Sequence, residues 1–139
     1  MNVIASDRQW HKVDGASSAA LDMLLQVSPI ELPLSYLRLL AFSNGGEGPL
    51  AKQPYYFQLD STEITTDAIT SGLHDEFFKG FIMIGSNGGG EFIAFDGRKS
   101  APWPVVALDM TNSDIEESIL AIAPDFDEFL GLIGLEPSA

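Results

Sequence analysis

The chain has 139 residues and no cysteine, which excludes disulfides, thiolate nucleophiles and cysteine-bound zinc. Its seven Lys and Arg residues stand against twenty Asp and Glu residues, so the formal net charge is −13. A protein with this charge repels nucleic acid and anionic membranes, which therefore are not the expected partners.

Helical spacing of apolar residues first occurs at 16–27, where an amphipathic helix is predicted. The stretch that follows, 28–46, carries two competing helix-start signals. Residues 28–31 (SPIE) resemble a capping box, but a helix that starts there would hold Pro33 in its interior at a cost of about 3 kcal/mol. We therefore predict a main helix that starts near Pro33 and ends in a left-handed stop at Asn-Gly-Gly, 44–46.

After residue 46 the pattern changes to that of short strands separated by turns. Strands are predicted at 54–60, 81–85, 91–96 and 104–110, and a short helix with a loose end at 61–78. Within 91–96, residues of an apolar face alternate with those of a mixed face, which is typical of an antiparallel sheet that has one face covered. A final helix is predicted within 123–134, with Pro124 near its start and Gly134 as its stop, whereas 112–123 fits a turn, a strand or a helix.

The glycine cluster in GSNGGGEF, 85–92, fits either a phosphate-binding loop or a hairpin turn. A phosphate loop needs a lysine after its last glycine and a helix after that, but Glu91 and a β-forming run follow here. We therefore favour a hairpin in which residues 87–90 take positive φ and close 81–85 onto 91–96.

Candidate catalytic or metal-binding groups are few. The run His74, Asp75, Glu76 offers metal ligands, but adjacent positions do not converge on one helix face, so a solvated helix end is favoured. Acid pairs at 116–117 and 127–128 fit acid–base chemistry only if buried, and a solvated surface is the favoured interpretation. We predict no catalytic residue, cofactor or metal.

The two tryptophans, Trp10 and Trp103, fit either plugs at the edge of the core or anchors of an interface, and the first is favoured.

The excess of acid is greatest near the C-terminus. Residues 100–139 contain no Lys or Arg and eight acids: Asp109, Asp114, Glu116, Glu117, Asp125, Asp127, Glu128 and Glu136. A basic protein is the natural partner of such a surface, because opposite potentials steer association. The alternative is that surplus acid only keeps the domain soluble.

Four motifs in order resemble the SUKH superfamily, which includes fungal cell-wall assembly regulators and bacterial immunity proteins against toxins. They are LPLSYLRLLAFSNGGEG (32–48), GFIMIGSNGGGEFIAFD (80–96), PVVALDM (104–110) and IAPDFDEFL (122–130). The resemblance covers about residues 16–134 of what we predict to be one domain, 1–139. The residues that fit the family pattern are Leu32, Pro33, Tyr36, Asn44, Gly45, Gly46, Ile84, Gly85, Asn87, Gly89, Gly90, Phe95, Phe126, Phe129 and Leu130.

The resemblance implies an α+β domain with a mainly antiparallel sheet, of about four or more strands, packed by helices. It also implies a non-enzymatic protein that binds and neutralises a cognate toxin as its immunity protein, within a toxin–antitoxin pair. The expected partner is a basic toxin domain, which the acidic face meets as a mimic of a phosphate backbone. The candidate contact residues are Glu47, Glu91, Asp109, Asp114, Glu116 and Glu117.

Two rival functions remain open from the sequence. One is a regulatory module like the fungal members, and the other is a small-ligand-binding domain or enzyme, which needs a pocket with convergent polar groups. The N-terminal stretch MNVIASDRQW lacks a basic region followed by an apolar run, and no stretch approaches the ~20 apolar residues of a membrane span. We expect a soluble, cytoplasmic protein.

Overall fold

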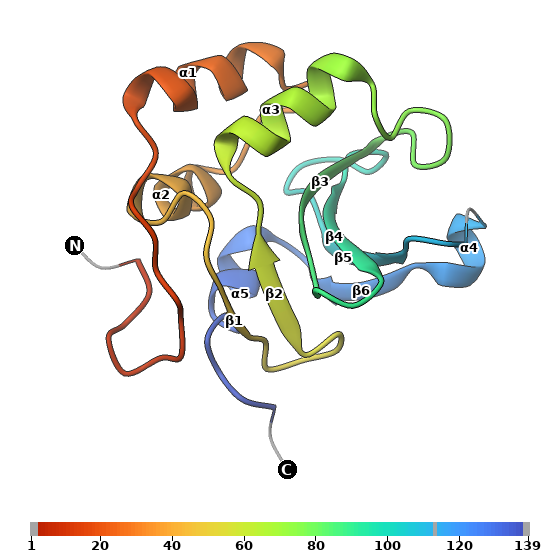
Figure 1. Ribbon diagram of the computed structural model, residues 1–139. Helices are drawn as coiled ribbons and strands as arrows, with labels where there is room; N and C mark the ends of the chain where they lie inside the picture. Colours follow the sequence, from red (N-terminus) through yellow and green to blue (C-terminus); the bar gives the residue numbers. More distant parts are fainter. Residues whose placement is uncertain (1–2, 113, 138–139) are drawn as a thin grey trace.

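The structure is a computed structural model, which describes residues 3–112 and 114–137. Helices and strands are mixed along the chain, which confirms the predicted α+β class (Figure 1). The helices are α1 (Ser18–Val27), α2 (Leu34–Phe42), α3 (Thr62–Ser71), α4 (Ile115–Ser118) and α5 (Phe126–Leu130). The strands are β1 (Glu47–Pro49), β2 (Tyr56–Leu59), β3 (Phe81–Ser86), β4 (Glu91–Asp96), β5 (Val105–Asp109) and β6 (Leu120–Ala123).

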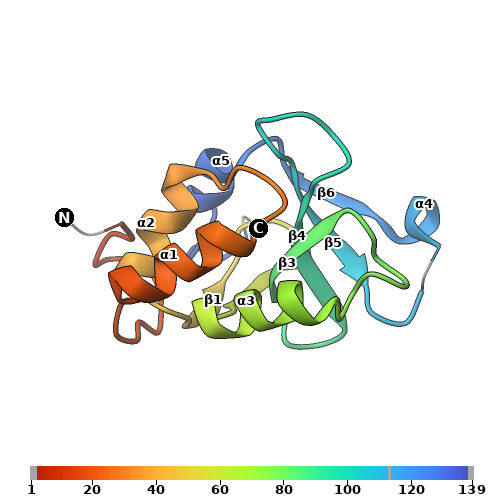
Figure 2. The same cartoon turned by 90° about the horizontal axis from the view of Figure 1, so that it is seen from above.

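The six strands form one curled sheet in the order β1-β2-β3-β4-β5-β6, and every neighbouring pair is antiparallel. This meander confirms the predicted antiparallel sheet. Helices α1 and α3 contact each other and lie side by side at one end of the sheet in both views (Figures 1 and 2). No helix among residues 3–112 and 114–137 is long and apolar enough to cross a membrane.

The main core lies between the helices and the inner face of the sheet. Its centre is a group of buried aromatic rings from α2, α5 and two strands: Tyr36, Phe57, Phe95, Phe126 and Phe129. Several pairs meet edge to face, such as Tyr36 and Phe95 at 5.3 Å and Phe57 and Phe129 at 5.0 Å between centroids. Such pairs add about 0.5–1.5 kcal/mol beyond the area they bury.

The conflict between helix starts near Pro33 is settled as the sequence predicts. Pro33 is the N-cap of α2, and its carbonyl oxygen accepts hydrogen bonds from the N–H groups of Tyr36 and Leu37. The Ser28 hydroxyl binds Ile30, so the SPIE stretch forms a turn and no capping box. Helix α2 ends at Phe42, and the predicted left-handed stop is wrong because its C-cap, Ser43, is extended.

The expectation of a sheet with one covered face is also wrong. A second apolar cluster lies on the outer face, beneath the 72–80 loop and α4, and contains Phe78, Phe81, Met83, Ala94, Val106 and Leu108. Both faces of β3, β4 and β5 are therefore covered, and even Asp96 at the end of β4 is buried. Burial alone would raise the pKa of Asp96, but hydrogen bonds from the Arg98 side chain and backbone outweigh it and lower the pKa.

Two predicted helices, those within 61–78 and 123–134, end earlier than expected, and the undecided stretch 112–123 is now assigned. Helix α3 ends at Ser71, and the left-handed Gly72 turns the chain into the loop that covers the outer cluster. The undecided stretch 112–123 contains both α4 and β6, and Ser113 within it lies outside the described residues. Helix α5 ends at Leu130 and not at Gly134, whose N–H donates to the carbonyl of Pro49.

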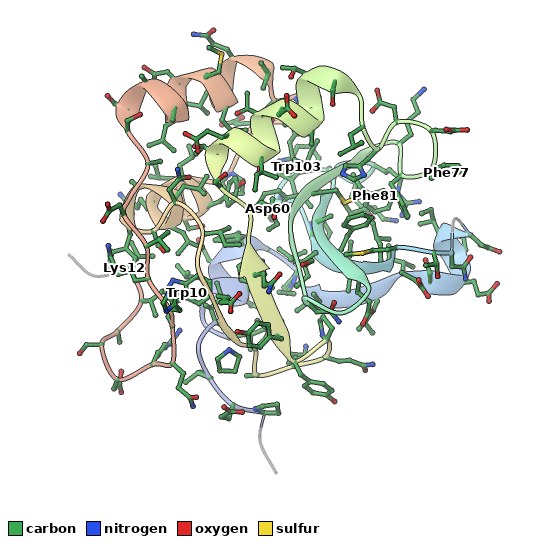
Figure 3. The ribbon with its side chains drawn as sticks, in the orientation of Figure 1. Trp10, Lys12, Asp60, Phe77, Phe81 and Trp103 are labelled. Atoms are coloured by element: carbon green, nitrogen blue, oxygen red, sulfur yellow. The ribbon has the colours of Figure 1, made fainter. Side chains whose placement is uncertain are left out.

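Asp60, which joins β2 to α3, is a half-buried carboxylate (Figure 3). Burial raises the pKa of Asp60, so the ionised carboxylate is less favourable in the folded chain than in the unfolded chain. We expect Asp60→Asn to raise the thermal unfolding midpoint at pH 7. The gain should vanish below about pH 4, where the carboxyl is protonated in both states. Thermal unfolding followed by circular dichroism at both pH values checks this, and an equal gain at low pH would contradict it.

Candidate protein-binding surface

The end of the sheet at the β3–β4 turn carries a row of linked polar side chains. Glu47, Gln58 and Ser86 lie opposite one another across β1, β2 and β3. The Gln58 amide donates to Glu47 Oε2 at 2.9 Å, and the Ser86 hydroxyl donates to Gln58 Oε1 at 3.4 Å. Glu47 is thereby connected to the β3–β4 turn, although β2 lies between β1 and β3.

The β3–β4 turn is organised by Asn87 and is not a phosphate cradle. Asn87 Oδ1 accepts hydrogen bonds from the backbone N–H groups of Gly89, Gly90 and Glu91, at 2.9, 3.1 and 3.0 Å. The Gly88 N–H donates to the Ser86 hydroxyl. These amides are already used, which agrees with the hairpin interpretation. Within this turn only Gly88 and Gly90 take positive φ, whereas the sequence predicts positive φ at all four residues 87–90.

Two predicted contact residues are brought together beside this turn. Glu91 and Asp109 are opposite partners in the β4–β5 ladder. Asn87 Nδ2 donates to Glu91 Oε1 at 3.2 Å, and hydrogen bonds from the backbone and hydroxyl of Thr111 lower the pKa of Asp109. Like charges directly opposite each other destabilise a sheet. A facing pair of acids that lowers the stability of the sheet is a candidate for binding a basic group of a partner.

The three predicted contact residues around α4 do not form one cluster with this pair. The Asp114 carboxylate caps α4 by accepting from the Glu117 N–H at 3.3 Å. Glu116 Oε1 lies 3.6 Å from Nη1 of Arg98, two residues beyond the end of β4, whereas Glu91 is the first residue of that strand. Glu116 therefore points toward the opposite end of β4 from Glu91.

Four of the seven cations are used in contacts within the molecule. Arg8 donates to the carbonyls of Leu130 and Ile133, and Lys52 to that of Ile122. Lys12 lies over the ring of Phe42, and Arg98 binds Asp96 and stacks on Phe81 (Figure 3 labels Lys12 and Phe81). The acidic side chains have few cations left to neutralise them, so the surface field is negative.

The tryptophans lie at the edge of the core, as the sequence predicts (Figure 3). Trp10 is half-buried, donates to the Ser43 hydroxyl at 3.3 Å and packs beside Phe57. Trp103 is half-buried and donates to the carbonyl of Glu31 at 2.8 Å. Neither indole nitrogen is left for a partner.

The run at 74–76 forms no metal site in the structure. The His74 imidazole packs against the rings of Phe78 and Phe92, and burial lowers its pKa despite the nearby Asp75 carboxylate. In the part of the chain that the structure describes, no three His, Cys, Asp or Glu side chains are grouped to hold a metal ion.

Residues of the predicted family pattern hold the fold together. Leu32, Tyr36, Phe126 and Phe129 are buried in the core, and Leu130 packs against it. The side chain of Asn44 binds α3: its Oδ1 accepts from the Thr62 N–H at 2.8 Å, and its Nδ2 donates to Glu63 at 2.9 Å. Gly45 and Gly46 take positive φ as the chain turns into β1.

Sequence reasoning missed Gln58 and Ser86, which join Glu47 to the turn, and it also missed Glu63 and Asp67 on α3. The two acids lie four residues apart on a helix that has no Lys or Arg. Residues four apart lie on one side of a helix, so this spacing in the sequence could have identified the two acids as a pair.

A curled antiparallel meander with helices on its inner face and acids at one sheet end defines an acidic α+β domain. Residues 15–132 match the model of the SMI1 / KNR4 family (SUKH-1), and the chain belongs to this family. A comparison with curated proteins found no match.

Proposed function

We propose that this SUKH-1 domain is a bacterial immunity protein that neutralises a cognate toxin by direct binding and catalyses no reaction. The observation that carries the proposal is the facing pair Glu91 and Asp109 at the end of the sheet. Hydrogen bonds hold both carboxylates in place, and the chain as a whole has a net charge of −13. Family membership supports a protein-binding role in general terms.

The proposed mechanism is electrostatic occlusion in the cytoplasm. A toxin that acts on nucleic acid needs a basic cleft, and carboxylates at the sheet end can occupy that cleft in place of phosphates. Opposite potentials raise the association rate by ~10 to 10³, and the covered cleft no longer admits its substrate. Glu47, linked to the turn through Gln58 and Ser86, extends the acidic surface.

A regulatory module is the second candidate, because the matched family model bears the name of the regulators that the sequence resembles. It predicts a constitutive cellular partner and no protection from a toxin.

Charge reversal at the sheet end tests the proposed surface. Tagged wild-type protein, E91K/D109K and D127K/E128K are used as baits in extracts of the native cells at one low salt concentration. Asp127 and Glu128 are exposed on α5, so the control variant has the same net charge as E91K/D109K. We expect E91K/D109K to bind the partner at least about tenfold more weakly, a loss of about 1.4 kcal/mol. Equal losses in both variants would contradict a specific surface at the sheet end.

A further inference from the structure

A groove of about 420 Å³ lies between α1 and α3, the two helices that stand side by side in Figures 1 and 2. Ala20 and Met23 line it from α1, and Met23 is 52% exposed. From α3 it is lined by three threonines at four-residue spacing and by two acids, namely Thr62, Thr66, Thr70, Glu63 and Asp67. The lining therefore combines methyl and thioether groups with two carboxylates.

The charge around the groove has one sign. Neither α1 nor α3 contains a Lys or Arg, and together they carry Asp22, Glu63 and Asp67. An apolar lining beside uncompensated carboxylates suits a ligand that is apolar on one side and cationic on the other.

The Glu63 carboxylate of the groove is fixed by hydrogen bonds within the chain. Glu63 is held by the Asn44 amide and the Thr62 hydroxyl, each at 2.9 Å, so its position and charge are set before binding.

We propose that this groove binds a basic amphipathic helix of a protein partner. The helix lies against α1 and α3 as a third helix, with its apolar residues on Met23 and the threonine methyl groups. Its Lys or Arg residues pair with Glu63 and Asp67. Helix-in-groove binding of this kind needs an apolar stripe and flanking charges of opposite sign, which the groove presents.

Other occupants fit the groove less well. A second copy of this chain brings a net charge of −13 to a negative surface, and its α1 and α3 carry no cation to place there. Nucleic acid is excluded by the same repulsion. The proposal does not depend on the partner being a toxin, and it concerns a surface separate from the Glu91–Asp109 pair.

The test uses a synthetic helical peptide of about 18 residues, with leucines on one stripe and lysines flanking it. A second peptide has the same composition in scrambled order. Binding to the full chain is followed by amide chemical shifts and by calorimetry. We expect the amphipathic peptide to shift Ala20, Met23 and the α3 residues and to bind at least about tenfold more tightly than the scrambled one.

Three variants locate the site. D67K is expected to weaken binding of the amphipathic peptide about tenfold, and Met23→Gln, which removes apolar contact without changing charge, severalfold. D127K, an equal charge change on the exposed surface of α5, should change the affinity less than about twofold. Equal effects of D67K and D127K, shifts centred on Glu91 and Asp109, or no preference between the peptides would overturn the proposal. Because the E91K/D109K bait experiment measures a different surface, failure of either proposal is recognised separately.

Discussion

Phe126→Ala is expected to lower the free energy of unfolding by about 3–5 kcal/mol. Phe126 is 1% exposed, and its ring lies 5.4 Å from Tyr36, 5.8 Å from Phe95 and 5.4 Å from Phe129 between centroids. The substitution leaves a cavity where α2, α5 and β4 meet. Because domains are stable by about 5–15 kcal/mol, a large share of the total stability is lost. Urea unfolding followed by circular dichroism measures the change.

The matched control for this prediction is Phe77→Ala. Phe77 is 58% exposed in the 72–80 loop, so its truncation should change the free energy of unfolding by no more than about 0.5 kcal/mol (Figure 3). Similar losses for the two variants would contradict the assignment of Phe126 to the centre of the core.

Gly85→Ala is expected to lower the free energy of unfolding by about 1–3 kcal/mol or more. A methyl group at Gly85 meets the backbone carbonyl oxygen of Gln58 on β2 and lies 2.8 Å from the ring of Phe57. Only two residue pairs, Gln58–Ser86 and Leu59–Gly85, join β2 to β3 in the described sheet. The strands must move apart, so amide exchange at Asp60, whose N–H donates to the carbonyl of Ile84 on β3, should become faster along with the loss of stability.

Gly89→Ala is the control in the same hairpin. Gly89 is exposed, does not take positive φ, and has only ordinary contacts at 3.7 Å or more for an added methyl group. Its substitution should change stability by about 0.5 kcal/mol or less. If Gly85→Ala proved equally neutral, this result would contradict the close approach of β2 and β3 at Gly85.

Local patterns predicted most of the helices and strands because their signals lie within the elements themselves. Pro33 predicted the start of α2, and the apolar runs at 81–85 and 91–96 predicted β3 and β4. The short strand β1 was missed, since Glu47–Pro49 contains glycine and proline and pairs only because β2 provides an edge. The outer apolar cluster was missed for a similar reason, because Phe78 reaches Met83 through the return of a loop.

The candidate surface was predictable in composition and not in geometry. Glu91 was a candidate as an acid near the glycine turn and Asp109 as part of the acidic stretch 109–117, but only the β4–β5 register places them opposite each other. Glu116 was grouped with them because it lies close in sequence, yet Arg98 holds it toward the other end of β4. The groove between α1 and α3 depends on the packing of two helices that are about 40 residues apart in sequence, which no local pattern reports.

The most direct test of the proposed immunity function is affinity purification of the tagged protein from its native cells at low salt, followed by a stepwise increase in salt. We expect one large partner with a basic toxin domain, which is released as salt rises because the contact is electrostatic. A housekeeping protein as partner, retention that salt does not change, or no partner at all would contradict it.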